Sequence, residues 1–180
     1  MSSNRSTAGR PAAVLIGSMG AGKSSVGIAL AQRLGVSFRD TDEDIEARTG
    51  MTIADLFVSQ GEPHFRALEF EAVRDALAEH PGVLALGGGA PMQPAVADLL
   101  AGHRVVFLDV GLAEAVRRVR LGTSRPLLLG NVRGQLRTRL DERRPVYESL
   151  AWLTMKVDTE TVEEIATGIA AELAQNEVAR

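Results

Sequence analysis

The chain has 180 residues, of which 45% are hydrophobic and 24% charged, and this composition is typical of one globular domain rather than a disordered or fibrous protein. Its net charge of −3 gives no general attraction to nucleic acid, and its lack of cysteine excludes disulfides, thiolate metal sites and a cysteine nucleophile. We expect a cytoplasmic protein with no nucleic-acid partner and no membrane partner.

Residues 1–10 are polar and rich in Ser, Gly and Arg, and the apolar run that follows is too short for a signal-peptide core or a membrane span. We predict a disordered leader over residues 1–10 and a single domain over residues 11–180. Apolar strand candidates then alternate with helical patterns, which is typical of an α/β fold with a parallel sheet. Strands are expected at 13–16, 36–39, 82–86, 104–109 and 152–157, and the clearest helices at 24–34, 65–77 and 162–173.

The first strand leads into residues 17–24, Gly-Ser-Met-Gly-Ala-Gly-Lys-Ser, which fit the phosphate-binding loop pattern G-x-x-x-x-G-K-[ST] at every constrained position. Glycines let successive backbone N–H groups turn inward around a phosphate, and the helix that follows directs its positive dipole end at the same point. Lys23 would reach the β- and γ-phosphates, and Ser24 would place its hydroxyl on Mg²⁺. A glycine-rich turn alone would not account for the Lys-Ser pair, so the loop predicts binding of a nucleoside triphosphate.

Acidic residues follow two other strand candidates. Asp40 and Asp42 could divide the work of phosphoryl transfer, one serving Mg²⁺ and the other the acceptor hydroxyl, or they could only cap the helix that follows. Asp109 is a second candidate for the metal, because several apolar residues precede it as in a Walker B strand. The pattern alone leaves both choices open.

Three consecutive glycines, residues 87–89, follow the third strand candidate. They favour close approach of backbone N–H groups to a ligand, although a simple loop would also use glycine. Farther along, Gly122 and Gly130 flank a segment that contains Arg125, and we predict a mobile lid at about residues 121–131.

Taken together, these motifs make the chain resemble the shikimate kinase family, whose members transfer the γ-phosphoryl group of ATP to the 3-hydroxyl of shikimate, a step of chorismate and aromatic amino-acid biosynthesis. The resemblance runs from about residue 13 to residue 157. It implies a three-layer P-loop NTPase fold with a five-stranded parallel sheet in the order 2-3-1-4-5, flanked by helices, with ATP and Mg²⁺ as cofactors and a monomeric state. The motifs that carry it are the phosphate loop, residues 40–42, Phe65-Arg66 followed by Glu69, residues 87–90, residues 125–128, and Arg143 ahead of residues 145–147.

The resemblance also implies which residues bind the acceptor, shikimate. The acid matching Asp42 binds shikimate hydroxyls and is the candidate catalytic base, and the arginines matching Arg66 and Arg143 hold the carboxylate, a task that suits the planar guanidinium. Glu69 follows Arg66 by three residues, about one helical turn, and could hold it in place. Further acceptor contacts are implied for Phe57, Phe65, Gly87, Gly88 and Gly89.

On the donor side, the resemblance assigns catalytic roles to Lys23 and to Arg125 of the lid, which would fold over the ATP phosphates. Mg²⁺ is implied at Ser24 and Asp40, which removes Asp109 from that role. Arg118 and residues 159–160 would lie near the adenine. The full set implied to bind the nucleotide is Gly20, Ala21, Gly22, Lys23, Ser24, Ser25, Arg118 and Arg125.

Two other functions remain as alternatives. Another small-metabolite kinase, such as one for gluconate, would share the scaffold and the phosphate loop, but a neutral or multiply hydroxylated acceptor would not require both Arg66 and Arg143 beside Asp42. A nucleotide-dependent regulatory switch would use the same loop to change partners. The chain has no Asn-Lys-x-Asp guanine signature, however, and the predicted lid favours a kinase.

Overall fold

The computed structural model describes residues 9–122 and 130–178. Five parallel strands form one sheet, and its order, β2-β3-β1-β4-β5, confirms the order expected from the sequence. The carboxyl ends of parallel strands meet at one edge of a sheet, which is where ligands bind in this class of fold. The strands are β1 (Ala13–Ile16), β2 (Phe38–Asp40), β3 (Val83–Ala85), β4 (Val105–Asp109) and β5 (Leu153–Lys156).

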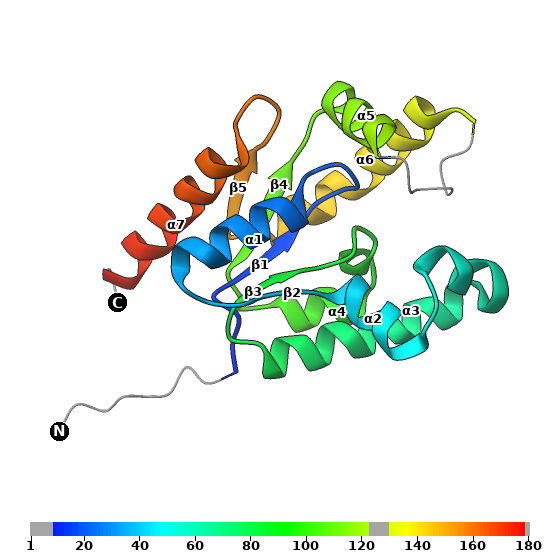
Figure 1. Cartoon of the computed structure of the whole chain (residues 1–180), viewed down its shortest axis with the longest axis horizontal. Coiled ribbons are helices and arrows are strands. Elements are labelled where there is room, and N and C mark those ends of the chain that lie inside the picture. Colours follow the sequence, from blue (N-terminus) through cyan, green and yellow to red (C-terminus); the bar gives the residue numbers. More distant parts are fainter. Residues whose placement is uncertain (1–8, 123–129, 179–180) are drawn as a thin grey trace.

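Helices cover both faces of the sheet and give the three layers that the sequence predicts. Figure 1 shows α1 beside α7 on one face, while α3, α4 and the last turns of α6 cover the other. None of the helices in the described part of the chain is long and apolar enough to cross a membrane. They are α1 (Lys23–Leu34), α2 (Thr41–Thr49), α3 (Ile53–Glu79), the short 3₁₀ helix η1 (Ala90–Met92), α4 (Pro94–Leu100), α5 (Leu112–Leu121), α6 (Val132–Leu150) and α7 (Val162–Val178).

The second strand begins later than its apolar pattern predicts, at Phe38 instead of Val36. The reason lies in the end of α1, where Gly35 takes a left-handed conformation with φ of 67°. The backbone N–H of Val36 then donates to the carbonyl of Ala31 at 3.0 Å and so completes the helix end instead of joining the sheet. As a result β2 is short, and its last residue, Asp40, stands directly at the start of α2.

Alternate residues of the central strand enter two different cores. Ala13 and Leu15 pack toward the α1 and α7 side, whereas Val14 and Ile16 pack toward α3 and α4, and all four are fully buried. This alternation is what a strand covered on both faces requires. It fixes the sheet rigidly beneath the loops that follow its strands.

A kink divides α3 and shapes one wall of the molecule. Gly61 has a non-helical backbone (φ 80°, ψ 165°) that interrupts the helix. Phe57 and Phe65 lie on opposite sides of this kink, yet their ring centroids are 4.6 Å apart, whereas eight residues of a straight helix would span about 12 Å. The kink therefore folds the first two turns of α3 back toward the rest of the helix.

Parts of the predicted leader and lid fall outside the described residues. Residues 1–8 of the leader and 123–129 of the lid, Arg125 included, belong to this group. Gly9 and Arg10 are described, and Arg10 Nη2 donates to the carbonyl of Gly102 at 3.2 Å. On either side of the lid segment, α5 ends at Leu121 and α6 begins after Asn131.

Candidate active site

A cavity of about 510 Å³ opens beyond the carboxyl ends of β1, β2 and β3. Its lining includes residues of α2 and α3 and residues of α5 and α6, and Figure 1 shows these two pairs of helices on opposite sides of the molecule. Of the predicted site residues that the structure describes, only Ala21, which is buried, is missing from its lining. The predicted residues that line it are Gly20, Gly22, Lys23, Ser24, Ser25, Asp40, Asp42, Phe57, Phe65, Arg66, Gly87, Gly88, Gly89, Arg118 and Arg143.

The phosphate loop has the backbone that anion binding requires. Gly20 and Gly22 both take positive φ angles, 83° and 86°, which L side chains rarely adopt. No side chain caps α1 at Gly22, so the first turn of that helix presents its backbone N–H groups to the cavity. Lys23 curls over the loop, and its Nζ donates to the carbonyls of Gly17 at 2.8 Å and Ser18 at 3.1 Å.

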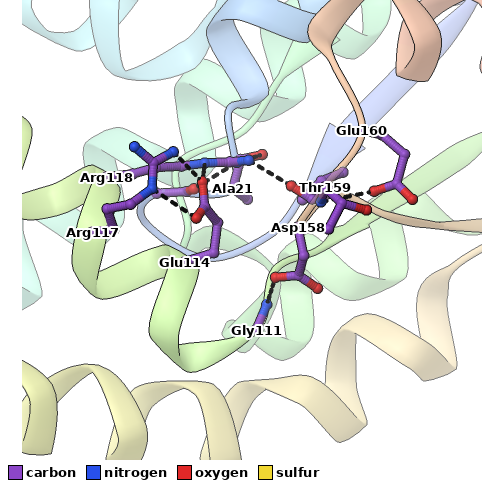
Figure 2. Close-up of polar contacts among 10 residues, drawn as sticks. Ala21, Gly111, Glu114, Arg117, Arg118, Asp158, Thr159 and Glu160 are labelled. Carbon is purple, nitrogen blue, oxygen red and sulfur yellow. Dashed lines mark hydrogen bonds and ion pairs between the residues drawn. The ribbon is translucent and has the colours of Figure 1, made fainter.

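Arg118 ties the phosphate loop to the end of β5 (Figure 2). Its Nη1 donates to the carbonyls of Gly20 at 3.2 Å and Ala21 at 3.4 Å, and its Nη2 donates to the carbonyl of Val157 at 2.5 Å. Nε of the same guanidinium donates to Glu114 Oε1 at 2.7 Å. The segment predicted near the adenine, residues 159–160, directly follows this contact but is exposed and does not line the cavity.

The two oxygens of Asp40 perform different tasks. Oδ1 accepts from the backbone N–H of Asp42 at 2.9 Å and so caps α2, while Oδ2 accepts from Ser24 Oγ at 3.2 Å. Capping and a place beside Ser24 are therefore compatible, although the sequence presents capping and metal binding as alternatives. Over residues 9–122 and 130–178, no three His, Cys, Asp or Glu side chains gather into a metal-binding group. A hydroxyl and one carboxylate suit Mg²⁺, which keeps few protein ligands and takes others from substrate phosphates.

Asp109, the other candidate for the metal, lies outside the cavity lining. It is 4% exposed and is held by two cations. Arg144 Nη1 donates to its Oδ1, and Lys156 Nζ donates to its Oδ2 at 2.5 Å. Both carboxylate oxygens of Asp109 thus form ion pairs with side chains of the protein.

Asp42 is the most strongly perturbed acid of the cavity. Burial raises its pKa to about 6, and the negative charges of Asp40 and Glu69 add to the shift, while Lys23 opposes it. Its Oδ1 is buried and accepts no hydrogen bond from any residue that the structure describes. A buried carboxylate oxygen in this state is well suited to accept a hydrogen bond from a ligand hydroxyl.

Arg66 is held rigidly from three sides. Its Nη1 donates to Glu69 Oε2 at 2.6 Å, its Nη2 donates to Glu62 Oε1 at 3.2 Å, and its Cζ lies 5.3 Å from the ring centroid of Phe65 and 5.9 Å from that of Phe57. Burial acts to lower the pKa of Arg66, but Glu69 and Glu62 outweigh it and keep that pKa above its ordinary value. The arginine is therefore charged and pre-oriented toward the cavity.

The three consecutive glycines leave room for site side chains. A Cβ atom on Gly87 would lie 2.6 Å from Asp42 Oδ1, one on Gly88 would lie 3.2 Å from Arg143 Nη1, and one on Gly89 would lie 2.6 Å from Arg66 Nη1. The sequence predicts close approach to a ligand at this turn. The structure adds another reason for glycine, because side chains from α2, α6 and α3 occupy the space in which each Cβ would stand.

Helix α6 contributes one cavity residue that the sequence analysis did not single out. Arg139 lines the cavity one helical turn before Arg143. The signal that could have found it is this spacing of four residues, which puts both arginines on the same face of a helix. Four residues after Arg143, Tyr147 donates its hydroxyl to the carbonyl of Gly88 at 2.6 Å.

The fold and the site together define a class of protein. A phosphate loop with Mg²⁺-type oxygen donors shares one cavity with a pocket built of a buried carboxylate and two arginines, as expected of a P-loop phosphotransferase. The family model of shikimate kinase matches residues 19–174. The shikimate kinase of Thermobifida fusca is 58% identical over 164 residues, which cover 91% of this chain and 95% of that protein. The chain belongs to the shikimate kinase family.

Solved structures agree with this assignment. The shikimate kinase from Acinetobacter baumannii, solved in complex with shikimate, has a TM-score of 0.87 at 34% identity and covers 94% of this chain and 95% of its own. A gluconokinase from Sinorhizobium meliloti is also similar, with a TM-score of 0.56 over 93% of this chain and 94% of its own. Its identity is only 23%, so this second likeness shows a shared fold and nothing more.

Proposed function

We propose that the chain transfers the γ-phosphoryl group of ATP to the 3-hydroxyl of shikimate, giving shikimate 3-phosphate and ADP. One observation carries the proposal: a single cavity joins the phosphate loop to an acceptor pocket in which Asp42 lies among Arg66, Arg143 and the glycines 87–89. A relative of the same fold and 34% identity was solved with shikimate bound. The proposed substrate follows from this match of family and pocket chemistry.

The acceptor pocket offers complementary groups to a small hydroxylated carboxylate. Arg66 and Arg143 would pair with the carboxylate through the parallel N–H donors of the guanidinium. Phe57 and Phe65 would pack against the apolar side of the ring. Asp42 would accept a hydrogen bond from the reacting hydroxyl and take its proton as the new oxygen–phosphorus bond forms.

On the donor side, the phosphate loop and the first turn of α1 would bind the phosphates with backbone N–H groups. Lys23 would exchange its contacts with loop carbonyls for phosphate oxygens. Ser24 and Asp40 would hold Mg²⁺, which when bound neutralises charge on the phosphates. Arg125 is proposed to add positive charge as the bond between the β–γ bridging oxygen and the γ-phosphorus breaks.

A kinase for gluconate is the alternative with the most similar scaffold. The pocket favours shikimate over it, because two arginines, two aromatic rings and a buried carboxylate suit a ring with one carboxylate better than an open polyol chain. The gluconokinase likeness carries no weight beyond the fold.

An ADP-release assay with Mg²⁺-ATP tests the proposal directly. Parallel reactions contain shikimate, gluconate or no acceptor. We expect ADP release that depends on shikimate, with gluconate close to the acceptor-free rate. ADP release that is indifferent to shikimate would overturn the proposed function.

Arg143→Ala tests the acceptor pocket within that assay. We expect the KM for shikimate to rise by roughly 10- to 100-fold, since a charge-assisted hydrogen bond contributes about 1.5–3 kcal/mol, while the KM for ATP changes little. Arg137→Ala is the matched control, because Arg137 is an exposed arginine of the same helix that does not line the cavity. Equal losses of shikimate and ATP binding in Arg143→Ala would contradict the acceptor role.

A further inference from the structure

An ion pair between buried Asp109 and half-buried Arg144 joins the sheet to the helix that carries Arg143. The Asp109 side chain, at the end of β4, is 5% exposed, and that of Arg144 is 33% exposed. Arg144 follows Arg143 directly, so the two side chains leave α6 about 100° apart. Arg143 lines the cavity, whereas Arg144 contacts Asp109. The two neighbours thus have separate tasks, one toward the ligand and one toward the sheet.

This part of α6 needs tertiary contacts to hold its position. Pro145 lies inside the helix, and its nitrogen carries no hydrogen for the bond to the carbonyl of residue 141. The turn that contains Arg143 and Arg144 is therefore weaker than an ordinary helical turn. Two contacts with other elements support it: Arg144 with Asp109 on one side, and the hydroxyl of Tyr147 with the carbonyl of Gly88 on the other.

We propose that Asp109 is a positioning residue for the acceptor site: through Arg144 it fixes the turn of α6 that presents Arg143 to the carboxylate of shikimate. The inference rests on the proposed function of the pocket. It gives the acid at the end of this Walker B-like strand a task on the acceptor side of the cavity, while the oxygens of Ser24 and Asp40 remain for the metal.

Steady-state kinetics of Asp109→Asn and Arg144→Met test the proposal. In each variant we expect the KM for shikimate to rise about 3- to 10-fold, with kcat, the KM for ATP and the Mg²⁺ requirement within about twofold of the parent. Arg144→Lys keeps the positive charge and should retain most of the affinity for shikimate. In the double variant the effect should equal that of either single change, because both remove the same contact.

Lys156→Met is the matched control. Lys156 pairs with the other oxygen of Asp109, but its side chain is 70% exposed and it extends from β5, so its loss leaves the contact with α6 in place. We expect the kinetic constants of Lys156→Met to match those of the parent protein. A rise in the shikimate KM as large as that of Arg144→Met would show a general loss of stability and would overturn the proposal.

Two further outcomes would also overturn it. One is an unchanged KM for shikimate in Arg144→Met, which remains informative even where Asp109→Asn fails to fold. The other is a changed Mg²⁺ requirement in Asp109→Asn, which would indicate that Asp109 helps to bind the metal. Failure of the proposed function itself would be separate and visible earlier, since the parent protein would then release no ADP in response to shikimate.

Discussion

Asp42 combines burial, two neighbouring carboxylates and an oxygen without a hydrogen-bond donor among the described residues, and each feature bears on how it can act as a base. Burial first, then the charges of Asp40 and Glu69, raise its pKa to about 6. A base with this pKa is ionised at neutral pH and yet binds a proton more strongly than an ordinary aspartate. The surroundings of Asp42 thus raise its pKa in the direction that favours acceptance of the proton from the reacting hydroxyl.

The pH dependence of kcat/KM for shikimate should reveal this pKa. A base acts in its deprotonated form, so we expect kcat/KM to be constant above about pH 7 and to fall as the pH drops through about 6, the value raised chiefly by burial. Measurements between pH 5 and 9 with saturating Mg²⁺-ATP check the prediction. In Asp42→Asn the acid limb should disappear together with most of the activity, roughly 100-fold or more. A parent profile that remains flat down to pH 5 would contradict the assigned base.

Gly89→Ala should damage the acceptor site without unfolding the protein. The backbone of Gly89 is in the right-handed helical region, where alanine fits, but the new methyl group would stand 2.6 Å from Arg66 Nη1. The flexible end of the arginine must move, so we expect the KM for shikimate to rise about 10-fold, as for a weakened charged hydrogen bond, with Tm nearly unchanged.

Gly134→Ala is the control for Gly89→Ala. It introduces a similar steric clash outside the cavity, and so separates the displacement of Arg66 from the general effect of an added methyl group. In Gly134→Ala the methyl group would stand 2.4 Å from Asn131 Nδ2, which does not line the cavity. This variant should keep the shikimate KM of the parent. A Gly89→Ala protein with parent kinetics would show that Arg66 reaches shikimate from another position.

At the scale of elements, the kink in α3 determines where one aromatic wall of the cavity stands. Gly61 has φ of 80°, which alanine adopts only at a cost of about 1 kcal/mol or more. We expect Gly61→Ala to straighten or shift the first turns of α3, move Phe57 away from Phe65, and raise the KM for shikimate severalfold. Kinetics combined with urea denaturation measure both effects.

Gly35→Ala is the matched control for the kink. Gly35 also has a positive φ, 67°, with nothing within 4 Å of the position of its missing Cβ, and it ends α1 away from the cavity. Both variants should lose a similar amount of stability. Only Gly61→Ala should lose affinity for shikimate, and a loss of affinity in both would mean that the site responds to stability alone.

The elements also show which parts of the fold can be predicted from sequence. Most strand positions, the phosphate loop and α1 were predictable because each depends on a local pattern: an apolar run, a glycine spacing, a helical period. The strand order came only from the resemblance to the shikimate kinase family, because it depends on pairing between strands far apart in the chain. The start of β2 was predicted wrongly because Val36 is apolar, whereas its N–H completes the end of α1. Val36 is also 38% exposed, so its apolar character indicated neither burial nor the element that uses its backbone.

The candidate site follows the same rule. The residues after the strands were predictable because parallel strands bring their ends together. That Asp40 caps α2 and contacts Ser24 at the same time, and that Asp109 pairs with Arg144, were not, since the Ser24 and Arg144 contacts join residues far apart in the chain. Arg139 was predictable in part. The sequence shows its helical spacing from Arg143, but it does not show that this face of the helix lines the cavity.

At the scale of the whole molecule, residues of α2 and α3 and residues of α5 and α6 face each other across one cavity. Ligands that contact both sides should therefore stabilise the protein. A ligand present at about 100 times its dissociation constant adds about 2.7 kcal/mol, which raises Tm by about 5–10 °C for a chain of this size.

Thermal unfolding with Mg²⁺-ADP, shikimate, both or gluconate checks this prediction. Mg²⁺-ADP and shikimate should each raise Tm, with the largest increase when both are present, and gluconate should leave Tm unchanged. An increase with gluconate equal to that with shikimate would favour the alternative acceptor. A monomeric state and a cytoplasmic location stay predictions, of which the first can be measured by light scattering.

The glycines at 87–89 have a consequence for how this site can vary among related proteins. Each one borders a side chain from a different helix, Asp42 from α2, Arg143 from α6 and Arg66 from α3. A side chain gained at one of these positions would therefore displace the opposing Asp42, Arg143 or Arg66 side chain from its present place in the cavity. A single replacement in this turn can therefore change which acceptor the cavity fits, because it moves a binding side chain that belongs to another helix.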